Sequence, residues 1–344
     1  MFAKTTSAAV LGIDAIAVSV EADVSFKAPA FMIVGLPDAA VRESRERVIT
    51  AITNAGYGLN DARIVISLAP ADIRKEGSSF DLPIAVALLQ AYGKITNADF
   101  SDVLLMGELA LDGTIKPVRG VLPASAMAKA QGLQAIIVPE ENAREAAVTG
   151  IDVYPVKTLD EAVEILTSGN AKPFRMSISD VFENAEPSPI DYSDVKGQDM
   201  VKRALTVAAS GAHNILMMGP PGSGKTMLAR RFPTILPTLN LQEAIETTKI
   251  HSVAGILPSN TALIAQRPFR SPHHTVSDAG LIGGGSIPKP GEVSLSHNGV
   301  LFLDEFPEFN RYVLEVLRQP LEDGMVTISR SALALTFPAR FTLV

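Results

Sequence analysis

The sequence predicts an α/β protein of two domains, and three observations support that prediction. Strand and helix patterns alternate through the first half of the chain, which is typical of α/β domains. A glycine-rich octapeptide over residues 219–226 lies between a short apolar run and a helix pattern. Another apolar run, over residues 299–303, ends in two carboxylates, Asp304 and Glu305. Because the strands of a parallel sheet are buried and end at one edge, these two runs predict such a sheet in the second domain.

The composition is that of a globular protein. Of 344 residues, 47% are hydrophobic and 19% are charged, which excludes a disordered chain. No apolar run is long enough to span a bilayer, and residues 1–7 lack the pattern of a signal peptide. The chain has no cysteine, which excludes disulfides and thiolate metal sites. We therefore expect a cytoplasmic protein without membrane contact. The net charge of −7 means that any contact with nucleic acid needs a local basic surface.

The domain boundary is predicted at a stretch rich in proline, serine and acidic residues. Residues 169–192 contain Pro173, Pro187 and Pro189 with weak apolar periodicity, which is typical of a linker. The first domain is then residues 1–168 and the second is residues 193–344.

Within the first domain, the clearest element is a helix over residues 38–55. Asp38 is its predicted N-cap, its apolar face includes Val41 and Val48, and Gly56 ends it. Its charged residues predict a solvated, ion-paired face: Arg42, Glu43, Arg45, Glu46 and Arg47. Strands are expected at 15–20, 31–34 and 63–68, and further elements at 82–91, 103–106, 123–130, 135–138 and 159–166.

The octapeptide predicts a phosphate-binding loop. It reads Gly219, Pro220, Pro221, Gly222, Ser223, Gly224, Lys225 and Thr226. Its glycines let successive N–H groups face one concavity at the start of a helix. Lys225 can reach the β- and γ-phosphates, and the Thr226 hydroxyl can hold Mg²⁺. The alternative is a glycine-rich turn without a ligand. A buried strand over 215–218 and a helix over 227–231 favour the phosphate loop.

The acidic pair supports the same interpretation. Asp304 is predicted to contact Mg²⁺ through water, and Glu305 to polarise the attacking water. Taken alone, an acidic turn after a core strand is the better interpretation, but downstream of a phosphate loop it becomes the minor one. The candidate catalytic set is therefore Lys225, Asp304 and Glu305.

The first domain resembles the proteolytic domain of the Lon family. Residues 75–79, Lys-Glu-Gly-Ser-Ser, match the segment with that family's nucleophilic serine, which falls on Ser79. Residues 107–120 and 138–142 match its later segment. The lysine that takes the serine proton is replaced by Leu122, and Asp81 replaces an expected small residue. Because a serine without a base is a poor nucleophile, the resemblance implies a catalytically inactive domain in which Ser79 is structural.

The second domain resembles AAA+ ATPases of the magnesium-chelatase type. Residues 191–205 look like the adenine-side segment, with Val195, Gly197 and Gln198 near the base. Residues 267–274 (Arg-Pro-Phe-Arg-Ser-Pro-His-His), 283–285 and 290–292, followed by Leu-Phe-Leu-Asp-Glu, resemble the ComM/YifB branch, in which an inactive Lon-like domain precedes the ATPase module. This resemblance implies ATP and Mg²⁺ as cofactors. It also implies a ring-forming, hexameric helicase that moves on single-stranded or branched DNA during recombination in natural transformation.

Two other functions stay open. One is a chaperone-like ATPase for metal insertion, as in magnesium chelatase, where a Lon-like domain is not expected. The other is an ATP-dependent protease, which Leu122 disfavours.

A basic loop is the candidate DNA contact. Arg267, Arg270, His273 and His274 lie among prolines and glycines, which suggests a mobile loop that tracks phosphates. Two alternatives are a His273–His274 metal pair and packing between subunits. Residues 329–340 are interpreted as a hairpin near a central pore.

The last residues show a strand pattern, 340–344, that stops without a cap or turn. In AAA+ proteins a sensor residue, the arginine finger and a helical lid follow. We therefore expect an incomplete ATPase domain within a longer protein. As a fragment it should bind nucleotide weakly, hydrolyse little and form no stable ring.

Overall fold

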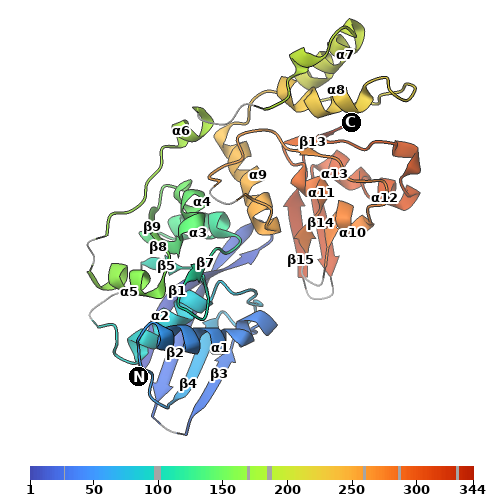
Figure 1. The fold of residues 1–344 in the computed structure, drawn as a ribbon. Helices are drawn as coiled ribbons and strands as arrows, with labels where there is room; N and C mark the ends of the chain where they lie inside the picture. Colours follow the sequence, from blue (N-terminus) through green and yellow to red (C-terminus); the bar gives the residue numbers. More distant parts are fainter. Residues whose placement is uncertain are drawn as a thin grey trace. The chain divides into compact units, whose positions relative to one another are not determined.

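The computed structural model describes residues 1–26, 28–96, 102–168, 171–183, 188–258, 261–285, 288–330 and 333–344. The chain forms two compact units, drawn in blue to green and in yellow to red in Figure 1. The first comprises Met1–Ile178 with Leu257–Ala262, and the second comprises Ser179–Ile256 with Leu263–Val344. None of the helices in the described ranges is both long and apolar enough to cross a membrane.

The first unit is built on a seven-stranded sheet with the order β3-β4-β2-β1-β5-β8-β9. β1 pairs antiparallel with β2, and β2 with β4, whereas the other neighbours are parallel. The strands are β1 (Phe2–Leu11), β2 (Asp14–Ser25), β3 (Ala30–Val34), β4 (Arg63–Ala69), β5 (Val103–Leu105), β8 (Ala135–Pro139) and β9 (Asp152–Val156). The pattern analysis missed β1.

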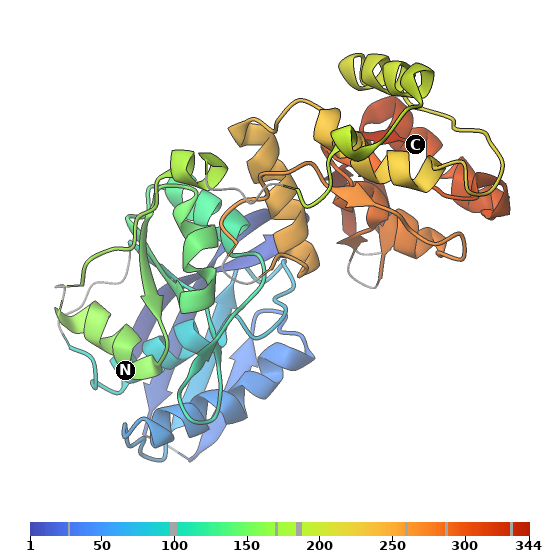
Figure 2. The ribbon, with the colours of Figure 1, turned by 45° about the horizontal axis from the view of Figure 1, so that its top comes forward.

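Helices pack on both faces of this sheet (Figure 2). Ala9 of β1 joins the core cluster of α1 (Ala39–Asn54), α2 (Asp81–Ala91) and α5 (Leu159–Ser168). Its neighbour Ala8 joins the cluster of α3 (Val121–Ala130) and α4 (Ala143–Ala147). Since successive strand residues point to opposite faces, the two clusters lie on opposite sides of the sheet.

Local capping explains where α1 begins. Asp38 Oδ1 accepts a hydrogen bond from Val41 N at 2.8 Å, which satisfies one of the free N–H groups of the first turn. The predicted helix and its cap are therefore confirmed. The smaller elements are β6 (Glu108–Leu109), β7 (Ile115–Lys116), η1 (Glu140–Asn142) and α6 (Ile178–Glu183). Within the predicted linker, Phe174 N donates to Val153 O at 2.7 Å, so this part of the segment packs on the first unit.

The second unit contains a parallel sheet of β10 (Phe269–Arg270), β13 (Gly299–Leu301) and β16 (Phe341–Leu343). Helices α7 (Asp199–Ser210) and α8 (Lys225–Arg231) pack with Val300 and Phe302 in one core cluster. Together with the first unit, this sheet confirms the predicted α/β fold class.

The segment before the phosphate loop corrects one prediction. Residues 215–218 form no assigned strand, and they are not buried as expected: Leu216 is 77% and Met218 is 87% exposed. The segment runs beside β16, because Ile215 N donates to Leu343 O at 2.8 Å. Ile215 and Met217 pack on the core. The apolar run at 215–218 is therefore a segment with one buried side, and its other side is exposed among the described residues.

The remaining elements surround this sheet. The chain forms two hairpins there, β11–β12 and β14–β15, and the second agrees with the predicted hairpin, whose residues 331–332 lie outside the described ranges. The elements are η2 (Tyr192–Asp194), η3 (Phe232–Ile235), α9 (Leu241–Ala254), α10 (Asp278–Leu281), β11 (Gly283–Gly284), β12 (Lys289–Pro290), α11 (Glu292–Leu295), η4 (Phe306–Glu308), α12 (Arg311–Glu315), α13 (Arg318–Asp323), β14 (Met325–Arg330) and β15 (Leu333–Pro338).

A buried histidine joins α9 to the residues that precede β13. His297 Nδ1 accepts from Arg340 N at 3.0 Å, so this nitrogen carries no proton. Its Nε2 lies 3.3 Å from Glu246 Oε2 and donates to it. Burial lowers the pKa of His297 below its ordinary value, against the opposing effect of Glu246. His251 Nε2 donates to Leu295 O at 3.0 Å, and burial lowers its pKa as well.

Acidification is therefore expected to destabilise the second unit. Burial lowers the pKa of both histidines in the folded protein, whereas the unfolded chain binds their protons below about pH 6.5. The stability that they contribute is present above that pH and is lost as the pH falls towards the folded pKa values, by up to about 1.4 kcal/mol per pH unit for each histidine. Urea unfolding at pH 7.5 and 5.5 measures this slope. His297→Gln should make it shallower, and the exposed His213→Gln should not; equal slopes in all three proteins would contradict the assignment.

Candidate active site

The glycine-rich loop bends sharply before α8. Gly222 and Gly224 have φ angles of 77° and 86°, in the left-handed region that favours glycine. A Cβ on Gly219 would lie 2.9 Å from Ser223 Oγ. These positions fit a loop whose backbone is approached closely by a ligand.

Two side chains of the loop also fit a phosphate ligand. Ser223 Oγ is buried and has no hydrogen-bond partner within the part of the chain that the structure describes. Lys225 Nζ donates to the carbonyl oxygens of Gly219 and Pro220 at 2.8 and 3.1 Å. Its partners are neutral, so the ammonium charge is available to pair with phosphate oxygens.

The structure brings the loop and the acidic pair together. Thr226 Oγ1 donates to Asp304 Oδ2 at 2.9 Å, across 78 residues of sequence. Asp304 follows β13 at the carboxyl edge of the parallel sheet. Hydroxyl and carboxylate oxygens are the donors that Mg²⁺ prefers, so this pair fits a magnesium ion that is bound together with a nucleotide phosphate.

Glu305 has an unusual backbone. Its φ angle is 55°, in the left-handed region, which costs a non-glycine residue about 1–3 kcal/mol and is found mainly at functional sites. Glu305 N donates to Asp304 Oδ1 at 3.1 Å. The side chain is 68% exposed, so its carboxylate is free to meet a ligand.

The predicted adenine-side segment lies beside the loop. Gly197 and Gln198 have φ angles of 65° and 57° at the start of α7, and Gln198 Nε2 donates to Ser223 O at 3.5 Å. Val195 is 1% exposed and packs in the core of the unit. Gly197 and Gln198 are therefore next to the loop, whereas the Val195 side chain is a packing residue.

The two arginines of the basic loop require a correction. The Arg267 side chain is 14% exposed, and its Nη1 and Nη2 donate to Asn298 O at 2.7 Å and Glu243 Oε2 at 3.2 Å. Arg270 forms a bidentate pair with Glu292 at 2.6 and 2.7 Å, which raises the pKa of its guanidinium group. Both guanidinium groups are thus paired with internal carboxylates, which weakens the positive surface expected from these arginines.

The two histidines lie beside the acidic pair. The rings of His273 and His274 have centroids 4.0 Å apart, and His274 Nδ1 is 3.6 Å from Glu305 Oε2. Sequence reasoning missed this contact. The signal was the parallel pairing of β10 with β13, which places the residues after both strands at one edge. The described residues contain no cluster of three His, Cys, Asp or Glu side chains that could hold a metal, so nothing supports the metal-pair alternative.

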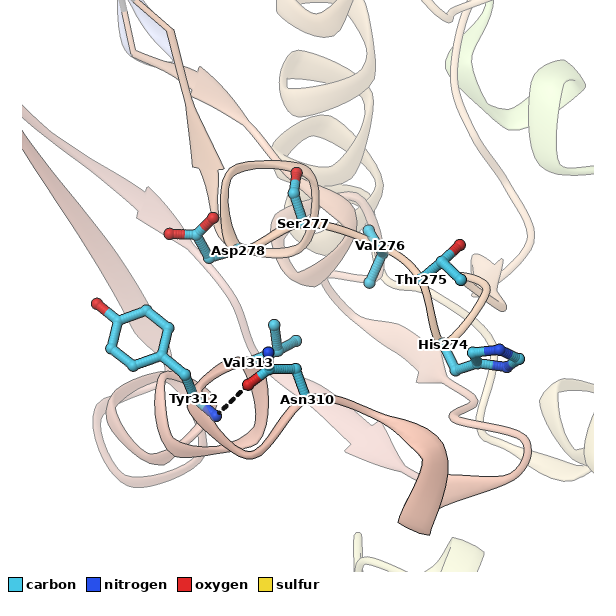
Figure 3. A pocket seen from close by; sticks show the side chains of 8 residues that line it. All are labelled: His274, Thr275, Val276, Ser277, Asp278, Asn310, Tyr312 and Val313. Atoms are coloured by element: carbon cyan, nitrogen blue, oxygen red, sulfur yellow. Dashed lines mark hydrogen bonds between the residues drawn. The ribbon is translucent and has the colours of Figure 1, made fainter.

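A pocket of about 380 Å³ adjoins this loop. Figure 3 shows His274 at one end of the lining and Asp278 and Tyr312 at the other. Asn310 Oδ1 accepts from Tyr312 N at 2.9 Å, which fixes the start of α12. The pocket walls are therefore formed by the segments that follow β10 and β13.

In the first unit, a buried ion pair lies next to the Lon-like serine segment. Asp81 accepts from Arg47 Nε at 2.7 Å, from Ser44 Oγ and from Leu109 N at 3.2 Å. Burial raises the pKa of Asp81, and its hydrogen bonds to Arg47 and Ser44 oppose that effect. Arg47 is only 22% exposed, so its predicted place on a solvated face is wrong.

Leu122, at the position where the Lon family has its lysine, is fully buried.

Comparison with known proteins gives separate family matches for the two parts of the chain. The family described as magnesium chelatase, subunit ChlI, matches residues 191–344, and a second ChlI family matches residues 20–142. An uncharacterised protein of Mycobacterium tuberculosis is 46% identical over 99% of this chain and 68% of its own length. The competence protein ComM of Haemophilus influenzae is 44% identical over 98% of this chain and 67% of its own. The chain belongs to the ComM/YifB family. The YifB protein of Escherichia coli is likewise 44% identical, over 98% of this chain and 66% of its own.

Membership of the ComM/YifB family confirms the predicted magnesium-chelatase-like AAA+ class. The Lon resemblance is also confirmed: Lon protease 2 of Bacillus subtilis is 33% identical over 141 residues, which are 40% of this chain and 25% of that protein. An AAA+ protein of this family is expected to use nucleotide and Mg²⁺, as the geometry of Thr226 and Asp304 allows.

Proposed function

We propose that the second unit hydrolyses ATP and that the protein is a DNA motor driven by this reaction. The contact between Thr226 and Asp304 carries the first part of the proposal, because it joins the phosphate loop to the acidic strand at the edge where α/β sheets bind ligands. Lys225 directly precedes Thr226 and supplies a cation, and Glu305 directly follows Asp304 and supplies a second carboxylate.

The proposed roles divide between binding and turnover. Lys225 and the loop N–H groups would hold the phosphates, and Ser223 Oγ, buried without a partner among the described residues, would supply a further donor. Thr226 and Asp304 would hold Mg²⁺, which would neutralise phosphate charge. Glu305 orients a water for attack on the γ-phosphorus and accepts its proton as the bond to ADP breaks. Gly197 and Gln198 face the base side.

The DNA part of the proposal depends on the relatives. One of them is named a competence protein, so we propose that this chain acts in recombination of incoming DNA, in the cytoplasm, as part of a hexameric ring that migrates DNA branches. Since Arg267 and Arg270 are paired internally, they are not proposed as DNA contacts. The exposed His273, whose ring packs on His274, stays a candidate contact.

The decisive measurement is ATP hydrolysis with and without DNA. Single-turnover assays with the protein in excess over ATP detect slow hydrolysis, and forked or single-stranded DNA is expected to raise the rate several-fold. High salt should remove the stimulation, because phosphate contacts weaken with ionic strength. Hydrolysis that no DNA changes would contradict the motor. Absence of hydrolysis in every condition would contradict the ATPase.

A second candidate is a chaperone-like ATPase that remodels a protein partner for metal insertion. The match of residues 191–344 to magnesium chelatase subunit ChlI favours it. The Lon-like first unit and the ComM likeness favour the DNA motor instead. We further propose that the first unit is not a protease, because Leu122 is buried where the family has its lysine. Cleavage of casein that Ser79→Ala abolishes would contradict this.

A further inference from the structure

We propose that His274 is a positioning residue that holds the Glu305 carboxylate in the orientation needed for hydrolysis. The inference rests on the proposed ATPase function and assigns a role within it to a residue outside the phosphate loop and the acidic pair. His274 does not touch the nucleotide in this proposal; it acts through Glu305.

The first supporting observation is the contact itself. His274 Nδ1 lies 3.6 Å from Glu305 Oε2. Within the described ranges, His274 is the one side chain that the structure places in ion-pair range of this carboxylate. The distance is longer than a hydrogen bond, as contacts between catalytic groups often are before substrate binds.

The second observation is that the imidazole ring is more enclosed than the carboxylate. His274 is 31% exposed, against 68% for Glu305. Its ring packs on His273, with centroids 4.0 Å apart, and edge-on against Phe309 at 6.4 Å. A ring packed against two aromatic neighbours restricts the rotamers open to the more exposed carboxylate beside it.

The third observation explains why Glu305 needs such a partner. Glu305 lies beyond the end of β13 and has a left-handed backbone, and its carboxylate has no backbone donor among the residues described here. A displacement of about 1 Å at a reacting group can lower the rate about 10²-fold. A neighbouring side chain that holds the Glu305 carboxylate in place would therefore raise the rate of hydrolysis.

The loop that carries His274 is closed by local hydrogen bonds and follows a paired strand. Val276 N donates to His273 O at 2.9 Å, and His273 Nδ1 pairs with Thr275 Oγ1 at 2.9 Å. β10 and β13 are paired in parallel, with Arg270 opposite Leu301. The residues that follow each strand, His274 and Glu305, are thereby held at the same edge.

The test compares His274→Ala with the exposed His213→Ala. His274→Ala is expected to lower kcat about tenfold, with KM and binding of a fluorescent ATP analogue unchanged, whereas His213→Ala keeps the wild-type rate. His274→Asn retains a side-chain donor and should recover part of the loss. In a Glu305→Gln background, the residual hydrolysis rate measured in single-turnover assays should not fall further when His274→Ala is added, because the effects of interacting residues are not additive.

Three results would overturn the inference. They are a wild-type or higher rate in His274→Ala, a loss that appears in ATP binding or melting temperature, or a full additional loss in the Glu305→Gln background. Each of these requires that the wild-type protein hydrolyses ATP. A wild-type protein that binds ATP without hydrolysing it would instead refute the proposed function, and the inference with it.

Discussion

Glu305→Gln is expected to stop ATP turnover while ATP binding is kept. The amide cannot accept the proton of the attacking water, and loss of a general base typically lowers a rate by about 10²-fold or more. Glutamine has nearly the same shape, and the contact between Thr226 and Asp304 does not involve this side chain. The measurement is kcat together with titration of a fluorescent ATP analogue.

Lys225→Ala provides the contrasting variant. Its ammonium group pairs with phosphate charge that is already present in the bound state, so its loss should remove nucleotide binding itself. If Glu305→Gln hydrolysed ATP at the wild-type rate, the role of this carboxylate would be refuted. If Lys225→Ala bound ATP normally, the loop would not be the phosphate site.

The largest expected effect on stability is at Asp81 in the first unit. Asp81→Ala leaves the Arg47 guanidinium and Leu109 N without their partner, and breaking a buried ion pair costs about 3–5 kcal/mol. Urea unfolding measures the loss. Glu46→Ala is the matched control: this exposed carboxylate pairs with exposed Arg45, and such pairs contribute about 0–1 kcal/mol.

A double replacement separates charge from packing. Arg47→Met with Asp81→Leu removes both charges together, and it should recover much of the stability that Asp81→Ala loses, because apolar residues often replace buried ion pairs without cost. A double variant as unstable as the single one would mean that shape, rather than the unpaired charge, causes the loss.

The phosphate loop and the acidic pair were predictable because each is a local pattern. Thr226 and Asp304 are far apart in sequence, but their places at the ends of a loop and of a strand predicted that they would meet. The α1 helix followed from Asp38 and its apolar spacing in the same way. In each case, the residue's place in its own element, at a helix start or after a strand, was enough to predict where it lies.

The errors concern contacts between elements. Arg267 and Arg270 formed a basic cluster in sequence, but they are paired with Glu243 of α9 and Glu292 of α11. Arg47 was assigned to a solvated face because its partner, Asp81, begins another helix. Helical spacing shows which residues share a face, but it does not show which buried carboxylate lies opposite.

The left-handed backbone of Glu305 has a consequence for substitutions at this position. Glycine or asparagine would occupy that conformation with less strain. Glu305→Gly is therefore expected to be tolerated by the backbone, while it removes the carboxylate to which we assign turnover. A homologue with glycine at this position, behind an intact phosphate loop, would thus be identifiable from its sequence as one that binds nucleotide as a static ligand.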